Sequence, residues 1–369
     1  MKLGRNEKCW CNSGKKYKHC HRNRFEENKP TTWETGKIQK QKFSRRICLA
    51  PNQLKNECSN KHIRAHTISK SSSLSAISTN GHVYSLDSDY TSFFANKGPK
   101  LKLQGIKKAS TFFGFCSQHD KKIFSDIENK KFVGSRKQCF LWGYRSVCLE
   151  LYKKIQAFAG PDLYDRIDAG RPLVEQLRIQ SFIASLRRGQ EAGLKNIEWH
   201  KSLYDQHLIT SSFESVRAYI IKFEKVLPIL CSSALFPIVD FEGTRLNDIS
   251  NSTTRPDLLS YASFAEGENG YVVFTWLPES DRYVEKFIQS IEQVTDNDLF
   301  NALTRFFLAS TENIHFAPAW WDELSSETQE AAIKRISNTF AASTTDELRS
   351  LLDDGIHYGD FEVSSYKKL

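Results

Sequence analysis

The chain has 369 residues and a formal net charge of +9, with 40% hydrophobic and 26% charged residues. This apolar share is enough to bury a core, which excludes an extended disordered chain. The charge is divided unevenly, because residues 1–150 carry 30 Lys and Arg against 11 Asp and Glu, a net +19. Residues 151–369 carry 22 against 32, a net −10. One uniform globular unit is therefore excluded, and the first part is suited to a polyanionic partner.

The cysteines indicate metal binding rather than disulfides. No run of about 18 apolar residues predicts a membrane span, and the start, MKLGRNEKCWC, lacks the apolar segment of a signal peptide. We therefore expect a cytoplasmic protein without membrane contact, in which the nine cysteines are reduced. Six of them precede residue 120, whereas Cys139, Cys148 and Cys231 stand among apolar residues and are predicted to be buried core thiols.

The strongest motif is a set of four metal ligands at the start of the chain. Cys9 and Cys11 are separated by one residue, and Cys20 and His21 follow. Three thiolates and one imidazole make a complete tetrahedral zinc site with no position open for a substrate. So short a segment cannot bury enough surface to fold alone, so zinc is expected to supply its folding energy. We predict a small zinc module over residues 1–24.

Residues 4–21, GRNEKCWCNSGKKYKHCH, resemble the SEC-C motif, a small zinc-binding module attached to many unrelated bacterial proteins. The resemblance implies that the three cysteines and the histidine named above are the ligands. The sequence departs from the common pattern at Lys8, Trp10 and Asn12, none of which is a ligand. Asn tolerates a left-handed backbone, so the turn at Asn12 is expected to form.

A second Cys/His-rich region follows a basic linker, predicted over residues 25–46. In the core predicted over 47–130, Cys116 and His119 have metal-ligand spacing, because one turn of chain brings both side chains together. Cys48 and Cys58, or His62 in place of Cys58, are the candidates that would complete this second site.

The same region resembles the HNH nucleases, which have the ββα-metal fold. The likeness lies in the run His66-Thr67-Ile68-Ser69-Lys70-Ser71, then Asn80, then Cys116 to His119. It implies that His66 is the general base, that Asn80 orients a loop, and that His119 helps to hold a catalytic Mg²⁺ or Mn²⁺ ion. The usual acidic residue before the histidine is Ala65 here, and the usual proline is Ser69. The alternative for His66 is a structural histidine in a zinc-stabilised fold.

Two functions follow from these patterns. The first is a metal-dependent HNH-like endonuclease acting on nucleic acid, with phage defence as a possible setting. The second is a non-catalytic zinc protein that binds nucleic acid or a protein partner. Both place nucleic acid on residues 1–150 through phosphate contacts. The candidate contact residues are basic: Lys15, Lys16, Lys18, Arg45, Arg46, Arg64 and Lys70.

The remainder, residues 131–369, predicts an α+β domain of unassigned role that offers a surface for a protein partner. Apolar periodicity predicts helices over 138–158, 171–205, 212–226 and 283–309, with antiparallel strands over 227–277. Capping boxes at Ser326–Gln329 and Thr344–Glu347 predict two more helix starts. Adjacent Trp320 and Trp321 follow a proline and are expected to fix a helix to the core. Beyond its motifs, the chain resembles uncharacterised bacterial proteins that join SEC-C to a Cys/His core, and that likeness implies no activity.

Overall fold

The computed structural model describes residues 3–31, 34, 45–87, 99–158, 164, 166–250, 253–340 and 347–369. Contacts between Cα atoms divide the chain into two compact units. One consists of Met1–Arg45 and Lys153–Lys195, and the other of Arg46–Tyr152 and Asn196–Leu369. The domain ranges predicted from the sequence stay a proposal beside this division. No described helix has the length and apolarity needed to cross a membrane.

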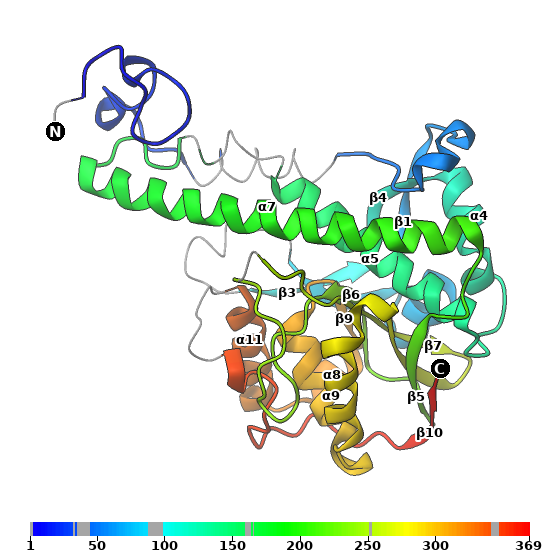
Figure 1. Ribbon diagram of the computed structural model, residues 1–369. Coiled ribbons are helices and arrows are strands. Elements are labelled where there is room, and N and C mark those ends of the chain that lie inside the picture. Colours follow the sequence, from blue (N-terminus) through cyan, green and yellow to red (C-terminus); the bar gives the residue numbers. More distant parts are fainter. Residues whose placement is uncertain are drawn as a thin grey trace. The chain divides into compact units, whose positions relative to one another are not determined.

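The second unit is built on an antiparallel sheet, and the described residues supply eight strands to it (Figure 1). In spatial order the strands are β10 (Val363–Lys368), β5 (Arg217–Phe223), β8 (Asn269–Trp276), β7 (Leu259–Glu266), β6 (Ile229–Leu235), β9 (Ile314–Phe316), β2 (His82–Leu86) and β3 (Leu101–Gly105). Outside the first 60 residues, the part of the chain that the structure describes contains the helices α2 (Ser75–Ile77), α4 (Ser117–Glu128), α5 (Arg136–Phe158), α7 (Leu173–Thr210), α8 (Asp281–Glu292), α9 (Asp296–Ser310), α10 (Pro318–Glu323) and α11 (Ser326–Phe340). The short 3-10 or π-helical segments described are η1 (Tyr17–His19), η2 (Arg24–Glu26), η3 (Asn52–Glu57), η4 (Lys70–Leu74), η5 (Pro278–Ser280) and η6 (Glu347–Arg349).

Alternating side chains bury both faces of the sheet. In β5, Tyr219 and Ile221 point into a core that includes Phe287 of α8 and Phe306 of α9. Ile220, between them, points into the opposite core with Trp142 of α5. Successive residues of a strand face opposite sides, so a strand covered on both sides is apolar throughout.

Helix α5 approaches the sheet closely at one glycine. A Cβ atom on Gly143 would lie 2.6 Å from Ser260 Oγ and 3.1 Å from two carbon atoms of Thr275. The Ser260 hydroxyl is already engaged, because it donates a hydrogen bond to the Thr275 carbonyl at 2.7 Å. Glycine is therefore the residue that this helix–sheet contact requires.

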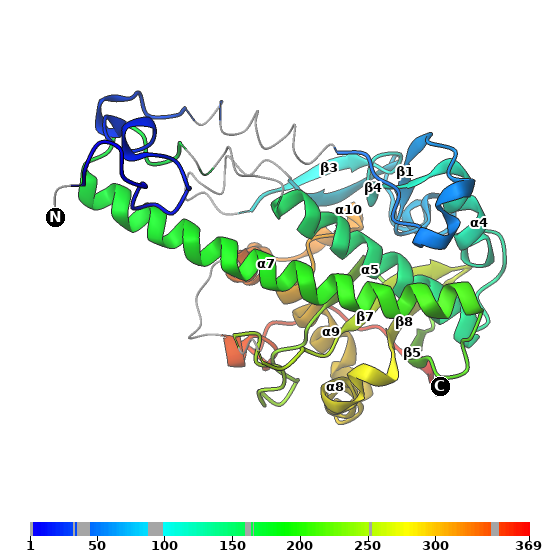
Figure 2. The same cartoon turned by 45° about the horizontal axis from the view of Figure 1, so that its top comes forward.

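A smaller β-β-α arrangement holds the second Cys/His region (Figure 2). Strand β1 (His62–His66) pairs antiparallel with β4 (Thr111–Cys116), and α4 begins at the next residue. The register sets His62 opposite Cys116 and His66 opposite Thr111. The α+β class and the antiparallel strands predicted from the sequence are confirmed, as are the three buried core thiols, each 0% exposed.

Three sequence predictions about elements differ from the structure. Residues 212–226 contain strand β5 rather than a helix, because their short apolar run fits the two-sided alternation described above. Residues 283–309 form parts of two helices, α8 and α9, with a break at residues 293–295. The cap of α11 is Ser325, whose Oγ accepts the Thr328 N–H at 3.1 Å, and not Ser326. The second capping box begins at residues 344–346, which lie outside the described residues, as does most of the basic linker, including residues 35–44.

The two tryptophans have structural contacts. Trp321 is 7% exposed and packs against Phe316, with ring centroids 5.1 Å apart. Trp320 donates its indole N–H to the Tyr358 carbonyl at 3.1 Å. These contacts support the expectation that the pair fixes α10 to the core.

Candidate metal centres

The first centre gathers Cys9, Cys11, Cys20 and His21. Their candidate ligand atoms all lie within 4.8 Å of one another. His21 Nδ1 lies 3.3 Å from Cys9 Sγ and 3.1 Å from Cys20 Sγ, and the Sγ atoms of Cys11 and Cys20 are 3.5 Å apart. Donors bound to one tetrahedral zinc ion would be about 3.5–3.8 Å apart, from Zn–S and Zn–N bonds of about 2.3 and 2.0 Å. The donor set therefore fits zinc, and these donor pairs are up to about 0.4 Å closer than that spacing.

The loop between the ligand pairs has the backbone expected of it. Asn12 adopts a φ of 60°, and Gly14 a φ of 75°. The Asn12 N–H donates to the Cys9 carbonyl, and the Cys9 N–H to the Lys15 carbonyl. Left-handed residues turn the chain sharply enough to bring the two halves of a ligand set together, so the asparagine at this position preserves the turn.

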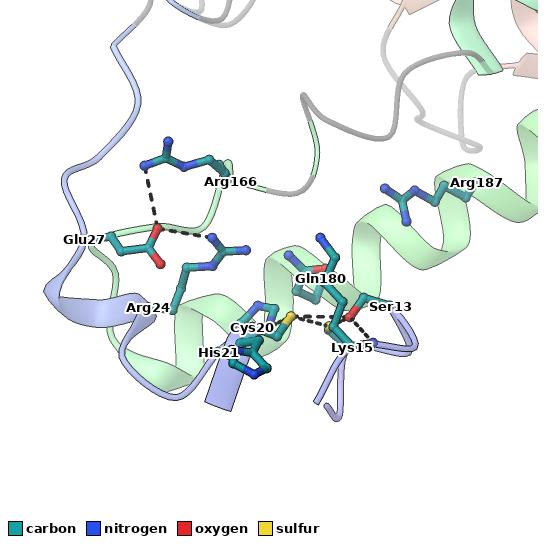
Figure 3. A pocket seen from close by; sticks show the side chains of 11 residues that line it. Ser13, Lys15, Cys20, His21, Arg24, Glu27, Arg166, Gln180 and Arg187 are labelled. Carbon is teal, nitrogen blue, oxygen red and sulfur yellow. Dashed lines mark hydrogen bonds and ion pairs between the residues drawn. The ribbon is translucent and has the colours of Figure 1, made fainter. Parts of the chain in front are cut away.

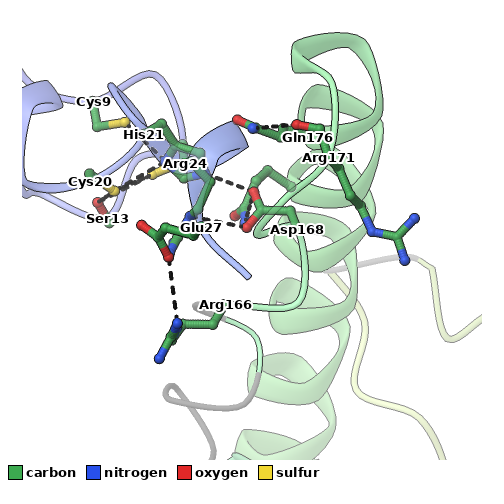
Figure 4. Close-up of polar contacts among 12 residues, drawn as sticks. Cys9, Ser13, Cys20, His21, Arg24, Glu27, Arg166, Asp168, Arg171 and Gln176 are labelled. Atoms are coloured by element: carbon green, nitrogen blue, oxygen red, sulfur yellow. Dashed lines mark hydrogen bonds and ion pairs between the residues drawn. The ribbon is translucent and has the colours of Figure 1, made fainter. Parts of the chain in front are cut away.

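Asp168 holds the histidine of the first centre from 147 positions along the chain (Figure 4). Its Oδ2 lies 2.8 Å from His21 Nε2 and accepts the Gln180 amide at 2.9 Å. Its Oδ1 lies 3.3 Å from Arg24 Nε, and the carboxylate is fully buried. Burial raises the pKa of Asp168, but the hydrogen bonds from His21 and Gln180 and the charge of Arg24 outweigh it and hold that pKa below its ordinary value. The group is therefore an ionised carboxylate, which fixes Nδ1 as the metal-facing nitrogen.

Backbone contacts fix the loop that carries Asp168. Gly170 donates its N–H to the Arg24 carbonyl at 2.9 Å. Its φ is 68°, and a Cβ atom there would lie 2.5 Å from the Glu27 carbonyl oxygen. The sequence interpretation missed Asp168, because no local spacing connects it with His21.

We predict that Asp168→Asn weakens zinc binding at the first centre by about 10- to 100-fold, the range found when such an outer carboxylate is removed. Competition with a chromophoric chelator measures the affinity. Glu175→Gln is the matched control, because Glu175 is an exposed acidic residue whose contact is with Arg171. Equal zinc affinity in Asp168→Asn and the wild type would contradict this role.

The second centre gathers Cys48, Cys58, Cys116 and His119, again with all four candidate ligand atoms within 4.8 Å. His119 Nδ1 lies 3.3 Å from both Cys48 Sγ and Cys116 Sγ. Cys48 is held beside β4, because the neighbouring residues Ile47 and Leu49 donate their N–H groups to carbonyls of that strand. Of the alternatives that the sequence left open, the structure places Cys58 rather than His62 in this cluster.

Cys116 ends β4 and caps α4, where its thiol accepts the His119 N–H at 3.5 Å. Burial raises its pKa, but hydrogen bonds from the His119 backbone and from Ser59 outweigh it and lower the pKa to about 6. A helix N-terminus favours a thiolate, which is the form that binds zinc. Both Cys/His clusters can therefore hold zinc in a closed four-ligand set.

The three predicted catalytic residues have different surroundings. His119 belongs to the second cluster, which contains neither His66 nor Asn80. His66 ends β1, and its Nε2 lies 3.1 Å from the Ile106 carbonyl oxygen. Asn80 has a φ of 51° in a turn with Gly81, and its carbonyl lies 2.8 Å from His82 Nδ1.

Charged side chains act on His66, and among them the sequence interpretation named Lys70 but missed Arg145. Burial lowers the pKa of His66, and the charges of Lys70 and Arg145 lower it further, so its ring is neutral at pH 7. Arg145 is 1% exposed; its Nη2 lies 2.6 Å from Glu128 Oε1 and 3.8 Å from Asp120 Oδ1. Burial raises the pKa of Asp120 to about 6 against the influence of Arg145. Arg145 therefore makes the buried region near His66 polar. Its positive charge also disfavours a metal cation there.

The predicted nucleic-acid contacts are mostly exposed. Lys15, Lys16, Arg45, Arg46, Arg64 and Lys70 are exposed, and Lys18 is half-buried. Arg46 and Arg64 flank one aromatic ring, with their guanidinium carbons 5.0 and 5.5 Å from the centroid of Phe113. These three residues are called the Phe113 patch below.

Comparison with known proteins identifies only the first centre. Residues 5–23 match the SEC-C motif. A stretch of 21 residues is 85% identical to the protein translocase subunit SecA of Pseudomonas putida and of Pseudomonas savastanoi pv. phaseolicola. This stretch is 6% of the chain and 2% of each SecA protein. No solved structure matches the chain. The chain carries a SEC-C motif, which often binds zinc, and its two Cys/His clusters fit a metal-binding protein.

Proposed function

We propose that the protein is a zinc protein that binds nucleic acid through its basic part, with both Cys/His clusters serving as structural sites. The observation that carries this proposal is that each cluster has four donors and leaves no position open on the ion. The basic excess of +19 over residues 1–150 supports a polyanionic partner. The Phe113 patch supports nucleic acid, because arginine beside an aromatic ring offers charge to phosphates and a face on which bases stack.

The double variant Arg46→Gln/Arg64→Gln tests this proposal. We expect it to bind single-stranded and duplex oligonucleotides about 10-fold more weakly than the wild type in 100 mM salt, with a shallower salt dependence. The matched control is Arg282→Gln/Lys286→Gln, because Arg282 and Lys286 flank Tyr283 in the same manner within the acidic part. Equal weakening by both variants, or no binding by the wild type in low salt, would overturn the proposal.

An HNH-like endonuclease is the second candidate, and one observation favours it. Strand β1 ends at His66, β4 pairs with it, and α4 follows β4 directly, which resembles the ββα-metal fold except that β2 and β3 of the larger sheet lie between β1 and β4 in the chain. A neutral imidazole can take a proton from water. A divalent Mg²⁺ or Mn²⁺ ion would neutralise phosphate charge during hydrolysis. Because His119 faces the three thiols, the ion would need other ligands, and Asp120 and Glu128 of α4, which both lie near Arg145, are acidic candidates.

Incubating the protein with plasmid DNA and with RNA in Mg²⁺ or Mn²⁺ tests the nuclease candidate. We expect metal-dependent cleavage that falls at least about 100-fold in His66→Ala. His82→Ala, which changes an exposed histidine at the start of β2, should retain the cleavage. Equal cleavage by His66→Ala and the wild type would exclude His66 as the base. Absence of cleavage in every metal would leave the binding function alone. The phage-defence setting is tested by plating phage on cells that express the wild type or His66→Ala.

A further inference from the structure

A pocket of about 300 Å³ adjoins the first metal centre, within the first unit, and three residues of that centre, Cys11, Cys20 and His21, line part of it (Figure 3). Its wall includes Ser13 and Lys15 from the SEC-C loop, Arg24 after it, and Arg166, Gln180 and Arg187 from the segment that precedes and forms α7. Four of these side chains are cationic. Glu27 is the acidic residue that lines the pocket. Basic groups from two distant segments therefore converge on a volume large enough for a small ligand.

Asp168 holds the Arg24 side chain in place. Its side chain is 9% exposed, and its Nε lies 3.3 Å from Asp168 Oδ1, the carboxylate that also holds His21. Because Asp168 is fully buried and contacts both residues, it connects the orientation of the arginine with that of the zinc ligand. The guanidinium is thus pre-organised, which reduces the entropy lost when an anion binds.

The Glu27 carboxylate occupies part of the pocket. Glu27 Oε2 lies 3.2 Å from Arg24 Nη1 and 3.7 Å from Arg166 Nη2. One carboxylate oxygen therefore stands between two guanidinium groups, which is the arrangement that also receives a phosphate oxygen. Glu27 is half-buried at the end of a short helical turn, so its side chain can rotate away without unfolding an element.

We propose that this pocket binds a phosphate group, which displaces the Glu27 carboxylate from Arg24 and Arg166 and also contacts Lys15 and Arg187. Arginine side chains match the geometry of phosphate oxygens and keep their charge at all physiological pH values. This site shares no residue with the Phe113 patch or with the nuclease candidate, although Lys15 is also one of the predicted nucleic-acid contacts. The ligand is either free phosphate or pyrophosphate, or the phosphates of a mononucleotide.

Isothermal titration calorimetry on the zinc-loaded full chain, with inorganic phosphate, pyrophosphate and ADP as probes, tests the proposal. We expect Arg187→Gln to weaken pyrophosphate binding by about 10-fold, and Arg188→Gln to leave it within about twofold, since Arg188 is the next residue and does not line the pocket. We expect Glu27→Gln to tighten binding several-fold. Glu26→Gln, the same charge change one position earlier and outside the pocket, should change it by less than about twofold.

The titrations also distinguish the two kinds of phosphate ligand. Similar affinity for pyrophosphate and ADP identifies the phosphate group alone as the ligand, whereas tighter binding of ADP identifies a nucleotide. Zinc content is measured for each variant first. If Arg187→Gln loses zinc, the comparison of Glu27→Gln with Glu26→Gln decides. Absence of binding by both wild type and Glu27→Gln at millimolar probe, or equal effects within each matched pair, overturns the proposal.

Discussion

Replacing Cys116 by alanine is expected to lower the zinc content from two ions per chain to one and to reduce the free energy of unfolding by about 4 kcal/mol or more. The thiol is fully buried, belongs to the second cluster and caps α4. Its removal leaves three donors where zinc needs four and uncaps the helix that carries His119. Elemental analysis measures the zinc, and urea unfolding measures the stability.

Cys139→Ala is the control for this experiment. Cys139 is also fully buried in the second unit, but it packs against the sheet and lies outside both clusters. We expect it to retain two zinc ions and to cost about 1–2 kcal/mol, as removal of a small core side chain does. If Cys116→Ala also retained two ions per chain, the second cluster would not be a zinc site.

The second large effect is expected for Gly143→Val. Valine would force its Cβ atom to within 2.6 Å of Ser260 Oγ and 3.1 Å of Thr275 unless α5 moves away from the sheet. Such overpacking costs about 3 kcal/mol. Gly189→Val is the matched control, because Gly189 is an exposed helical glycine and a Cβ atom added there would have nothing within 4 Å.

The control should change the free energy of unfolding by less than about 0.5 kcal/mol, since valine differs little from glycine in helix propensity at an exposed site. Urea unfolding of both variants gives the comparison. Equal stability of the two variants would show that α5 accommodates a side chain at position 143.

Short-range chemistry was predictable from the sequence, and long-range packing was not. The first Cys/His set spans 13 residues, so its spacing alone suggested one ion. The second set joins Cys48 to His119 across 71 positions, and the sequence left Cys58 and His62 as alternatives. In the structure Cys58, the residue that follows η3, belongs to the cluster.

Strand β5, which the sequence predicted as a helix, shows why short apolar runs are ambiguous. Residues 218–221 are apolar on both faces because α5 covers one side of the sheet and α8 with α9 the other. A strand buried twice loses the polar alternation that would distinguish it from a helix. The order of the eight strands and the partnership of Asp168 with His21 depend on such tertiary contacts, which no local pattern records.

The separation between His21 and Asp168 has a consequence for the order of assembly. The four ligands of the first centre are synthesised within 13 residues, so a nascent chain can bind zinc soon after it emerges. Asp168 follows 147 positions later, which is roughly 7–30 s of translation at 5–20 residues per second. During that interval we expect zinc alone to hold the imidazole, so that the metal exchanges more easily. We therefore expect the newly made protein to pass through a labile zinc-bound stage, which ends when Asp168 has been added and holds His21.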